Sequence, residues 1–383
     1  MFVSIGAIVC ATFCKYKKNL FYYTNYFKKR DELLPLWRKE IQQRNPLSSK
    51  NTIFTISENT GYSASTVSRV LSGQAEKYRI SQTAVEIITK EARRCNYRPN
   101  MVAQSLRTQR SMTIGLLLPE IDNPFFATLS GIIIGLLEAR GYHTLLSDSR
   151  ENSKEEMNAL RMFQGRNVDG IICVPVAESP AFHEEVGQQI PMVLIDRYFK
   201  ETTLPYVCTD NYQGAYLATE FLLKRGYQRI LAIQGVPQSM PNKERVRGFE
   251  AALNGSGANG LVVGNAFSTE NGFQQTINAF EGADKPYDAI FAFSSTILLG
   301  VISALRKLQL KPAADIGVIS FDNNGFLDFL DPAVTRIEQP LRESGEIAVD
   351  TLFSIMAARR QGLPEPEPLH MLIPPTLVVR ESC

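Results

Sequence analysis

Residue types that bind metals or form crosslinks are scarce in this sequence of 383 residues. It has three histidines, at positions 143, 183 and 370, and six cysteines, none of which belongs to a Cys-x-x-Cys pair. Zinc sites and disulfide frameworks need such residues at close and regular spacing. We therefore expect no metal ion, no disulfide framework and no other cofactor.

The motifs of several common enzyme classes are also missing. The sequence contains no G-x-S-x-G nucleophile turn, no phosphate-binding P-loop and no cluster of metal ligands. Each of these motifs places a reactive group or a phosphate at a defined turn. Their absence therefore argues against the enzyme classes that these motifs identify. We expect a protein that is not an enzyme, and turnover of a bound ligand would contradict this expectation.

Long apolar runs are few, and the one that begins the chain is short. Residues 1–14 are apolar and are followed by the basic sequence KYKK. A membrane span needs about 20 apolar residues, and a secretory signal carries its charge before the apolar run. Residues 1–51 form an atypical N-terminal extension with three open interpretations: a translation start placed too early, an additional DNA-contacting arm, or a membrane tether. We expect no membrane partner and a cytoplasmic location.

Positive and negative residues nearly balance over the whole chain, which has a net charge of +2, but they are unevenly distributed. Residues 1–51 carry ten Lys and Arg against three Asp and Glu, and residues 52–111 carry nine against four. The remaining residues carry 22 against 32, a net charge of −10. A basic N-terminal part on an acidic body is the charge distribution expected of a nucleic-acid-binding protein.

Residues 52–71 predict two short helices joined by a tight turn. Thr52 can cap a helix that runs to about Thr60, and Gly61 can take the positive φ that turns the chain. Ser63 can cap a second helix over residues 64–71, whose exposed face is small, polar and cationic. This pattern is typical of a helix-turn-helix that enters the major groove, although an ordinary helical hairpin is the alternative. The expected DNA contacts are Thr52, Ser63, Ala64, Ser65, Thr66, Ser68 and Arg69.

A third amphipathic helix over residues 81–94 precedes a set of short motifs. They are TVSRVLSG at 66–73, NYRPN at 96–100, VAQSLRT at 102–108 and TIGLLLPEIDNPFF at 113–126. With these motifs the chain resembles the LacI-type family of bacterial transcriptional regulators, which includes lactose, purine and galactose repressors. The resemblance runs from about Thr52 to the C-terminus.

The resemblance implies a helix-turn-helix DNA-binding domain over residues 52–99 and a hinge helix over residues 100–111. In this family the hinge helix orders on the operator, and its leucine enters the minor groove, a role that would fall on Leu106. A short isolated helix is marginal in water, and a wedged leucine costs unstacking but opens a bent site. The DNA contacts expected from this segment are Asn100, Val102, Ala103, Leu106 and Arg107.

From residue 112 onward, short apolar runs alternate with amphipathic segments. The expected strands are residues 113–119, 143–149, 169–175, 191–196, 229–235, 261–267, 288–294 and 316–322. The expected helices are residues 125–140, 154–165, 211–225, 243–254, 270–281, 295–309 and 340–356, and a closing strand is expected within 374–382. This alternation predicts parallel sheets with helices on both faces.

The expected fold class is an all-α helix-turn-helix head followed by an α/β body of two lobes. By resemblance, the body over residues 112–383 is of the periplasmic-binding-protein-like (type I) kind. The expected first lobe covers about residues 112–208 and 340–368, and the second covers about 209–339 and 369–383. The chain would thus cross between lobes near Thr209, Gln339 and Leu369.

Ligands of such folds bind where the carboxyl ends of the strands face the cleft. Aromatic rings can cover a sugar or base, and Arg and Asp can bind hydroxyls. At Ser294-Ser295 the chain departs from the Asn-Asp that the family usually shows. The expected contacts of a small effector, a sugar or sugar derivative, are Phe125, Phe126, Arg245, Phe267, Ser294 and Asp322.

The resulting hypothesis is a sequence-specific transcriptional regulator, expected to be a repressor. Its partners would be a double-stranded DNA operator, the effector and a second copy of the chain, because two-fold operators match dimers. The alternative is the solute-binding protein of a sugar transporter, which has a similar body. Residues 52–110 argue against that alternative, because a solute-binding protein needs no helix-turn-helix.

Overall fold

The computed structural model describes residues 52–97, 110–281 and 286–383. The chain divides into two compact units, residues 1–100 and 101–383, which are referred to below as the head and the body. Most of the expected hinge lies outside the described residues. The same holds for five of the expected DNA contacts: Asn100, Val102, Ala103, Leu106 and Arg107.

The described part of the head, residues 52–97, contains α2 (Ile53–Thr60), α3 (Ala64–Leu71) and α4 (Gln82–Arg94). The predicted caps Thr52 and Ser63 are confirmed, because each hydroxyl accepts a hydrogen bond from a backbone N–H in the first turn. Ser81 caps α4 in the same way. Gly61 ends α2 with a φ of 71°. These caps satisfy donors that have no partner inside the helices. The head is held by a small apolar core of Ile56, Val67, Val70, Ile88 and Ala92.

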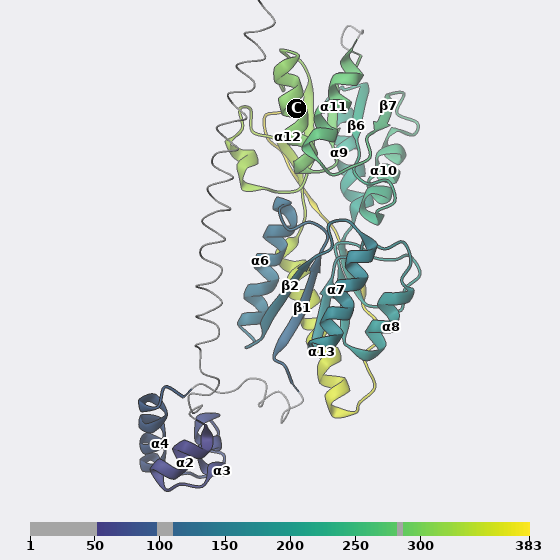
Figure 1. The fold of residues 1–383 in the computed structure, drawn as a ribbon. Coiled ribbons are helices and arrows are strands. Elements are labelled where there is room, and N and C mark those ends of the chain that lie inside the picture. The colour runs from purple at the N-terminus through teal and green to yellow at the C-terminus, as the bar shows by residue number, and fades with distance from the viewer. Residues whose placement is uncertain (1–51, 98–109, 282–285) are drawn as a thin grey trace, which may run out of the picture. The chain divides into compact units, whose positions relative to one another are not determined.

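The first lobe of the body is built on a sheet of six parallel strands in the order β11-β5-β4-β3-β1-β2. The strands are β1 (Thr113–Leu118), β2 (His143–Asp148), β3 (Gly170–Cys173), β4 (Met192–Ile195), β5 (Tyr206–Thr209) and β11 (His370–Ile373). One face packs against α6 (Pro124–Glu138) and α13 (Leu341–Gln361), and the other against α7 (Ser153–Gly165) and α8 (Ala181–Gln189) (Figure 1).

The second lobe repeats this plan with the strand order β12-β10-β9-β8-β6-β7, in which only β12 is antiparallel to its neighbour. The strands are β6 (Arg229–Ile233), β7 (Asn259–Val263), β8 (Ala289–Ala292), β9 (Gly317–Phe321), β10 (Thr335–Glu338) and β12 (Thr376–Val378). The helices are α9 (Asn211–Lys224), α10 (Met240–Leu253), α11 (Thr269–Phe280) and α12 (Ser295–Lys307), with a short 3-10 helix η1 (Gly325–Phe329). The two-lobed α/β body is therefore confirmed.

The expected crossing near Thr209 agrees with the structure, and the expected crossing near Leu369 is wrong. β5 ends at Thr209 and belongs to the first sheet, so the first crossing follows that residue. β11 pairs in parallel with β5, so residues 370–373 belong to the first lobe, and the last crossing lies at Pro374–Pro375 rather than near Leu369. The sequence hides β11 because it is an edge strand with half of its side chains exposed, so its apolar pattern is weak. The four-residue strands β5 and β10 and the helix α8 were not predicted either.

Among the described residues, no helix combines the length and the hydrophobicity that crossing a bilayer requires.

Two glycines let α11 and α12 approach each other closely. A Cβ on Gly300 would lie 2.0 Å from the carbonyl oxygen of Thr269, and a Cβ on Gly272 would lie 2.1 Å from that of Ile297. Both distances are far inside contact range, and both obstacles are backbone atoms that cannot rotate away. Only glycine fits at these positions, so the packing of α12 against α11 depends on them.

We expect Gly300→Ala to lower the free energy of unfolding of the body by about 1 to 3 kcal/mol, because the added methyl group overpacks the contact between α11 and α12. Gly165, the last residue of α7, has nothing within 4 Å of a built Cβ. Gly165→Ala is the matched control and should stabilise by up to about 1 kcal/mol. Urea denaturation of both variants checks this, and equal effects would contradict the close-approach argument.

Candidate functional site

Four charged side chains are buried where the two sheets of the body present their carboxyl ends. Asp196 and Arg197 directly follow β4 in the first lobe, Arg245 lies on α10 in the second lobe, and Asp322 directly follows β9. Each is less than a tenth exposed. Asp196 lies close enough to Arg245 and Asp322 for their charges to affect its pKa. Charged groups of the two lobes therefore face one another.

Arg245 is held entirely by its own lobe. Its Nε donates to Asn211 Oδ1 at 2.7 Å, and its Nη1 donates to the carbonyl oxygen of Phe293. The guanidinium lies over the ring of Phe321, 3.8 Å from the centroid. Burial lowers its pKa, an effect opposed by Asp322 and Asp196. The predicted side chain is thus fixed by contacts within the second lobe, rather than by an ion pair with a carboxylate of the first lobe.

Asp322 is also fixed in place. It has a φ of 75°, and its Oδ2 accepts from the backbone N–H and the hydroxyl of Ser295 at 3.1 and 3.3 Å. Its Oδ1 accepts from Gln339 Nε2 at 2.6 Å. The hydroxyl of Ser295 in turn accepts from Asn324 Nδ2. This network ties the start of α12 to the ends of β9 and β10.

Gln339 is a member of this site that the sequence marked only as a crossing point between lobes. Its Oε1 is buried and has no hydrogen-bond partner among the described residues. A buried acceptor without a partner is rare in a folded protein and indicates a ligand or a water. A hydroxyl group placed beside Gln339 and Asp322 would meet two acceptors.

Asp196 and Arg197 were missed by the sequence analysis, although they follow a predicted strand at the same sheet edge. Arg197 binds Glu151 through two hydrogen bonds of 2.9 and 2.6 Å, the bidentate geometry that fixes a guanidinium best. Asp196 is less well compensated, because its nearest ion-pair contact is Arg197 Nε at 4.0 Å. Burial raises the pKa of Asp196 to about 6, against the opposing effects of Arg197 and Arg245.

The remaining predicted effector contacts lie around this group rather than in it. Phe125 and Phe126 are buried in the core of the first lobe, with ring centroids 5.0 Å apart, and only Phe126 approaches Arg197, at 5.8 Å. Phe267 is half-buried and its ring covers Gly235. Ser294 caps α12, and its hydroxyl accepts from the backbone N–H of Ile297 at 3.1 Å. The structure therefore brings Arg245 and Asp322 together. The three predicted aromatic residues lie outside this charged group.

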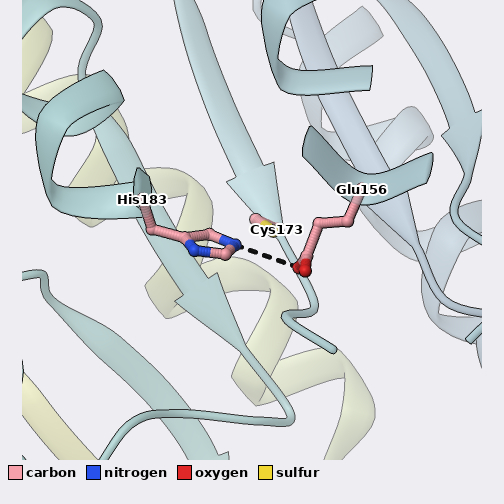
Figure 2. Close-up of side chains that lie close together, drawn as sticks. All are labelled: Glu156, Cys173 and His183. Carbon is pink, nitrogen blue, oxygen red and sulfur yellow. Dashed lines mark hydrogen bonds and ion pairs between the residues drawn. The ribbon is translucent and has the colours of Figure 1, made fainter. Parts of the chain in front are cut away.

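A second buried polar group lies inside the first lobe, at the carboxyl end of β3. Figure 2 shows Glu156 on α7, His183 on α8 and Cys173 at the end of β3, all with no exposed surface. Their ligand-type atoms lie within 4.8 Å of one another, the spacing of a metal site. His183 Nε2 and Glu156 Oε1 are 2.9 Å apart.

The hydrogen bonds of Glu156 argue for a structural tie at this place. Its two carboxylate oxygens accept from the backbone N–H groups of Val176 and Ala177, each at 2.8 Å. Burial, with the charge of Glu156, raises the pKa of the Cys173 thiol well above its usual value, so it holds its proton. A metal needs a thiolate and free lone pairs. The donor set instead fits a carboxylate that fastens the turn after β3 to α8.

In the head, the predicted DNA contacts of α3 lie on one accessible face. Ser65 and Arg69 are exposed one turn apart, and Ala64, Thr66 and Ser68 are half-exposed. The hydroxyl of Ser63 lies 2.8 Å from that of Ser65 and 2.9 Å from that of Thr66. Thr52 is exposed and is engaged in a capping box with Thr55. Arg69 carries the one long cationic side chain of α3, and its guanidinium lies over Tyr78.

Comparison with known proteins gives consistent results. The model of the family described as "periplasmic binding proteins and sugar binding domain of LacI family" matches residues 111–365. The ribose operon repressor of Halalkalibacterium halodurans is 32% identical over 331 residues, which cover 86% of this chain and 96% of that protein.

Solved structures agree with these matches. A LacI family transcriptional regulator from Enterococcus faecium, crystallised with bound ribose, has a TM-score of 0.61 and 28% identity over 70% of this chain and 98% of that one. The lac repressor dimer bound to operator and an anti-inducer has a TM-score of 0.75 and 24% identity over 86% of this chain and 98% of that one, a likeness of fold.

We expect Asp196→Asn to stabilise the body at pH 7 and to leave it unchanged near pH 4. The pKa of Asp196 is about 6 in the folded state against about 3.9 in an unfolded chain. As the pH rises from 4 to 6, the unfolded chain loses this proton first, so the folded state of the parent loses up to about 3 kcal/mol of stability. Urea denaturation at pH 4, 5, 6 and 7 would measure the difference.

The exposed carboxylate of Asp350 provides the control for this experiment. Asp350→Asn should follow the parent at every pH to within about 0.5 kcal/mol. An Asp196→Asn variant that is less stable than the parent at pH 7 would show that the ionised carboxylate stabilises the site.

We expect Glu156→Ala to lower the melting temperature of the body by roughly 6 to 12 °C. The change leaves the partly buried N–H groups of Val176 and Ala177 and the buried ring of His183 without their acceptor. At about 1 kcal/mol each, the loss of about 3 kcal/mol corresponds to this shift, because a domain of this size loses about 2 to 4 °C per kcal/mol. Glu155→Ala, at the exposed neighbouring position on α7, is the control and should have little effect. Added Zn²⁺ or a chelator should leave the parent's melting temperature unchanged, and stabilisation by Zn²⁺ that requires Glu156 would refute the structural assignment.

Proposed function

This chain belongs to the LacI family of transcriptional regulators, and we propose that a sugar or sugar derivative held between its two lobes controls its binding to operator DNA. The observation that carries the proposal is the facing of buried charges across the lobes, Asp196 and Arg197 on one side and Arg245 and Asp322 on the other. The named roles and bound ligand of its relatives agree with it, since they include a ribose operon repressor and a ribose-bound regulator.

The chemistry of the site supports a ligand with several hydroxyl groups. The carboxylates of Asp196 and Asp322 and the free Oε1 of Gln339 accept hydrogen bonds, and the guanidinium of Arg245 donates them. A neutral polyol satisfies such a mixed set without adding a net charge to a buried site. Phe267, one of the predicted effector contacts, is only half-buried, and an aromatic ring suits the C–H face of a sugar.

The proposed control works through the distance between the lobes. A ligand that touches both Asp196 and the second-lobe pair, Arg245 and Asp322, binds best when the lobes are close, so it favours that arrangement. The chain enters the first lobe at Ser111, whose N–H and hydroxyl donate to Asp169 at 2.8 and 3.0 Å. Movement of the first lobe would therefore reach the segment that leads to the head.

The DNA contacts proposed for the head are the two caps, Thr52 and Ser63, and the accessible residues of α3, with Arg69 binding the base edges. The hinge contacts Asn100, Val102, Ala103, Leu106 and Arg107 stay predictions. A homodimer is the proposed binding form, because two copies of α3 would match the two halves of a palindromic operator. Binding chromosomal DNA would require the protein in the cytoplasm.

The relatives carry the names of repressors and transcriptional regulators, so the solute-binding alternative is not favoured. The same relatives favour a protein that binds its ligand without converting it.

The test combines DNA selection with ligand binding by the full chain. We expect the protein to select palindromic sites from random double-stranded DNA, and calorimetry with a panel of pentoses, hexoses and their phosphates to identify a ligand that changes affinity for those sites. Asp322→Asn should weaken that ligand roughly 10- to 100-fold, because a hydrogen bond to a charged group is lost. Its DNA affinity without ligand should equal that of the parent.

Asp350→Asn again provides the control, since this exposed carboxylate lies outside the site. The proposal is wrong if no site is selected by a folded dimer, or if Asp322→Asn binds the sugar as tightly as the parent does.

A further inference from the structure

Tyr78 lies beneath the side chain proposed to read bases. The guanidinium carbon of Arg69 is 4.0 Å from the centroid of the Tyr78 ring. Arg69 is on the exposed face of α3, and Tyr78, which is 43% exposed, belongs to the segment between α3 and α4. Lys77 Nζ is 5.9 Å from the same ring, a longer and weaker contact.

The segment that carries Tyr78 is a hydrogen-bonded structure rather than a loose connection. The N–H of Gln74 donates to the carbonyl of Arg69 at 2.9 Å, and the N–H of Tyr78 donates back to Gln74 at 3.3 Å. The N–H of Ile80 donates to Ala75 at 2.9 Å, and both of these residues pack on the core of the head. The ring of Tyr78 is therefore held at a defined place relative to α3.

The position of Arg69 makes this contact consequential. The other accessible polar side chains of α3, those of Ser65, Thr66 and Ser68, are short. A long arginine on an exposed helix face samples many rotamers in water, and ordering it on DNA costs conformational entropy. An aromatic ring under the flat face of the guanidinium restricts it to one plane and leaves the N–H donors at its edge free.

Such an arrangement fits one kind of base contact. Guanine presents its O6 and N7 acceptors side by side in the major groove, and an arginine binds both through two parallel N–H groups. That geometry requires the guanidinium edge to meet the base edge in one plane. A ring that fixes the plane of Arg69 before binding thus favours guanine over the other bases.

We propose that Tyr78 is a positioning residue that holds Arg69 for bidentate recognition of guanine, so that the segment between α3 and α4 contributes to operator specificity. This inference rests on the proposed DNA-binding function. Tyr78 acts through Arg69 and need not touch the base. The contact depends on the ring and its π face rather than on the phenol hydroxyl.

The test compares the full-length parent with Tyr78→Phe, Tyr78→Leu, Tyr78→Ala and Arg69→Ala. Sites are first selected from random double-stranded DNA with the parent, and affinities are then measured for duplexes that carry each single base-pair change. Arg69→Ala should lose the preference for guanine at one position of each half-site. Tyr78→Ala and Tyr78→Leu should reduce that same preference by roughly three- to tenfold and leave the other positions unchanged.

Tyr78→Phe keeps the ring and should retain the parent's preference. Tyr78→Leu keeps apolar bulk without a π face, so a preference as strong as that of Tyr78→Phe would show that Tyr78 only packs and would overturn the inference. A uniform loss of affinity for all duplexes, including scrambled ones, with a changed salt dependence would indicate a phosphate contact and would also overturn it.

These outcomes are separate from failure of the proposed function. If the parent selects no site, the DNA-binding proposal fails and this inference fails with it. If the parent selects a site and the Tyr78 variants read every base as the parent does, only the positioning role is lost. Thermal melting of each variant confirms that the head, which is small and depends on five core residues, is folded in every comparison.

Discussion

Burial of charge between the two lobes is the constraint on which the body depends. Asp196 and Arg197 on one sheet edge and Arg245 and Asp322 on the other are nearly inaccessible to water. Removing a charge from water is costly unless hydrogen bonds or opposite charges replace the water. Three of the four groups have such replacements inside their own lobe. Asp196 has the weakest compensation for its lost hydration, and its pKa is therefore raised to about 6.

This uneven compensation explains why the site is suited to binding. Arg245 and Asp322 are fixed by partners within the second lobe, so a ligand would meet them already oriented. Asp196 and the buried Oε1 of Gln339 lack such partners, so hydroxyl groups of a ligand would donate the hydrogen bonds that these oxygens do not receive from the protein. Donors and acceptors that are already oriented lower the entropic cost of binding. A ligand that fills the unpaired acceptors would favour the arrangement that binds it.

The head follows the same physical logic on its surface. Its caps and small core hold α3 in place, and the stacking of Arg69 on Tyr78 orders a side chain that solvent would otherwise leave mobile. Inside the first lobe, the carboxylate of Glu156 accepts hydrogen bonds from backbone N–H groups and from His183, and so holds α8 in place. In each place a polar group is oriented by a neighbour that is distant in the sequence or lies in a different element.

The sequence by itself determined what depends on near neighbours along the chain. Thr52, Gly61 and Ser63 mark the ends of helices because caps act within three or four residues. The apolar runs marked the central strands, and the ends of those strands pointed to Arg245 and Asp322. β5 and β10 escaped because their apolar patterns are short, and β11 escaped because half of its side chains are exposed.

Tertiary structure alone decided the pairings across long separations. It assigned β11 to the first lobe beside β5, more than 160 residues earlier in the chain. It brought Asp196 within range of Arg245 and Asp322, and it set Gln339 against Asp322. Such contacts arise from the packing of whole sheets. No local periodicity encodes them, because the energy of a buried charge depends on groups that only folding brings together.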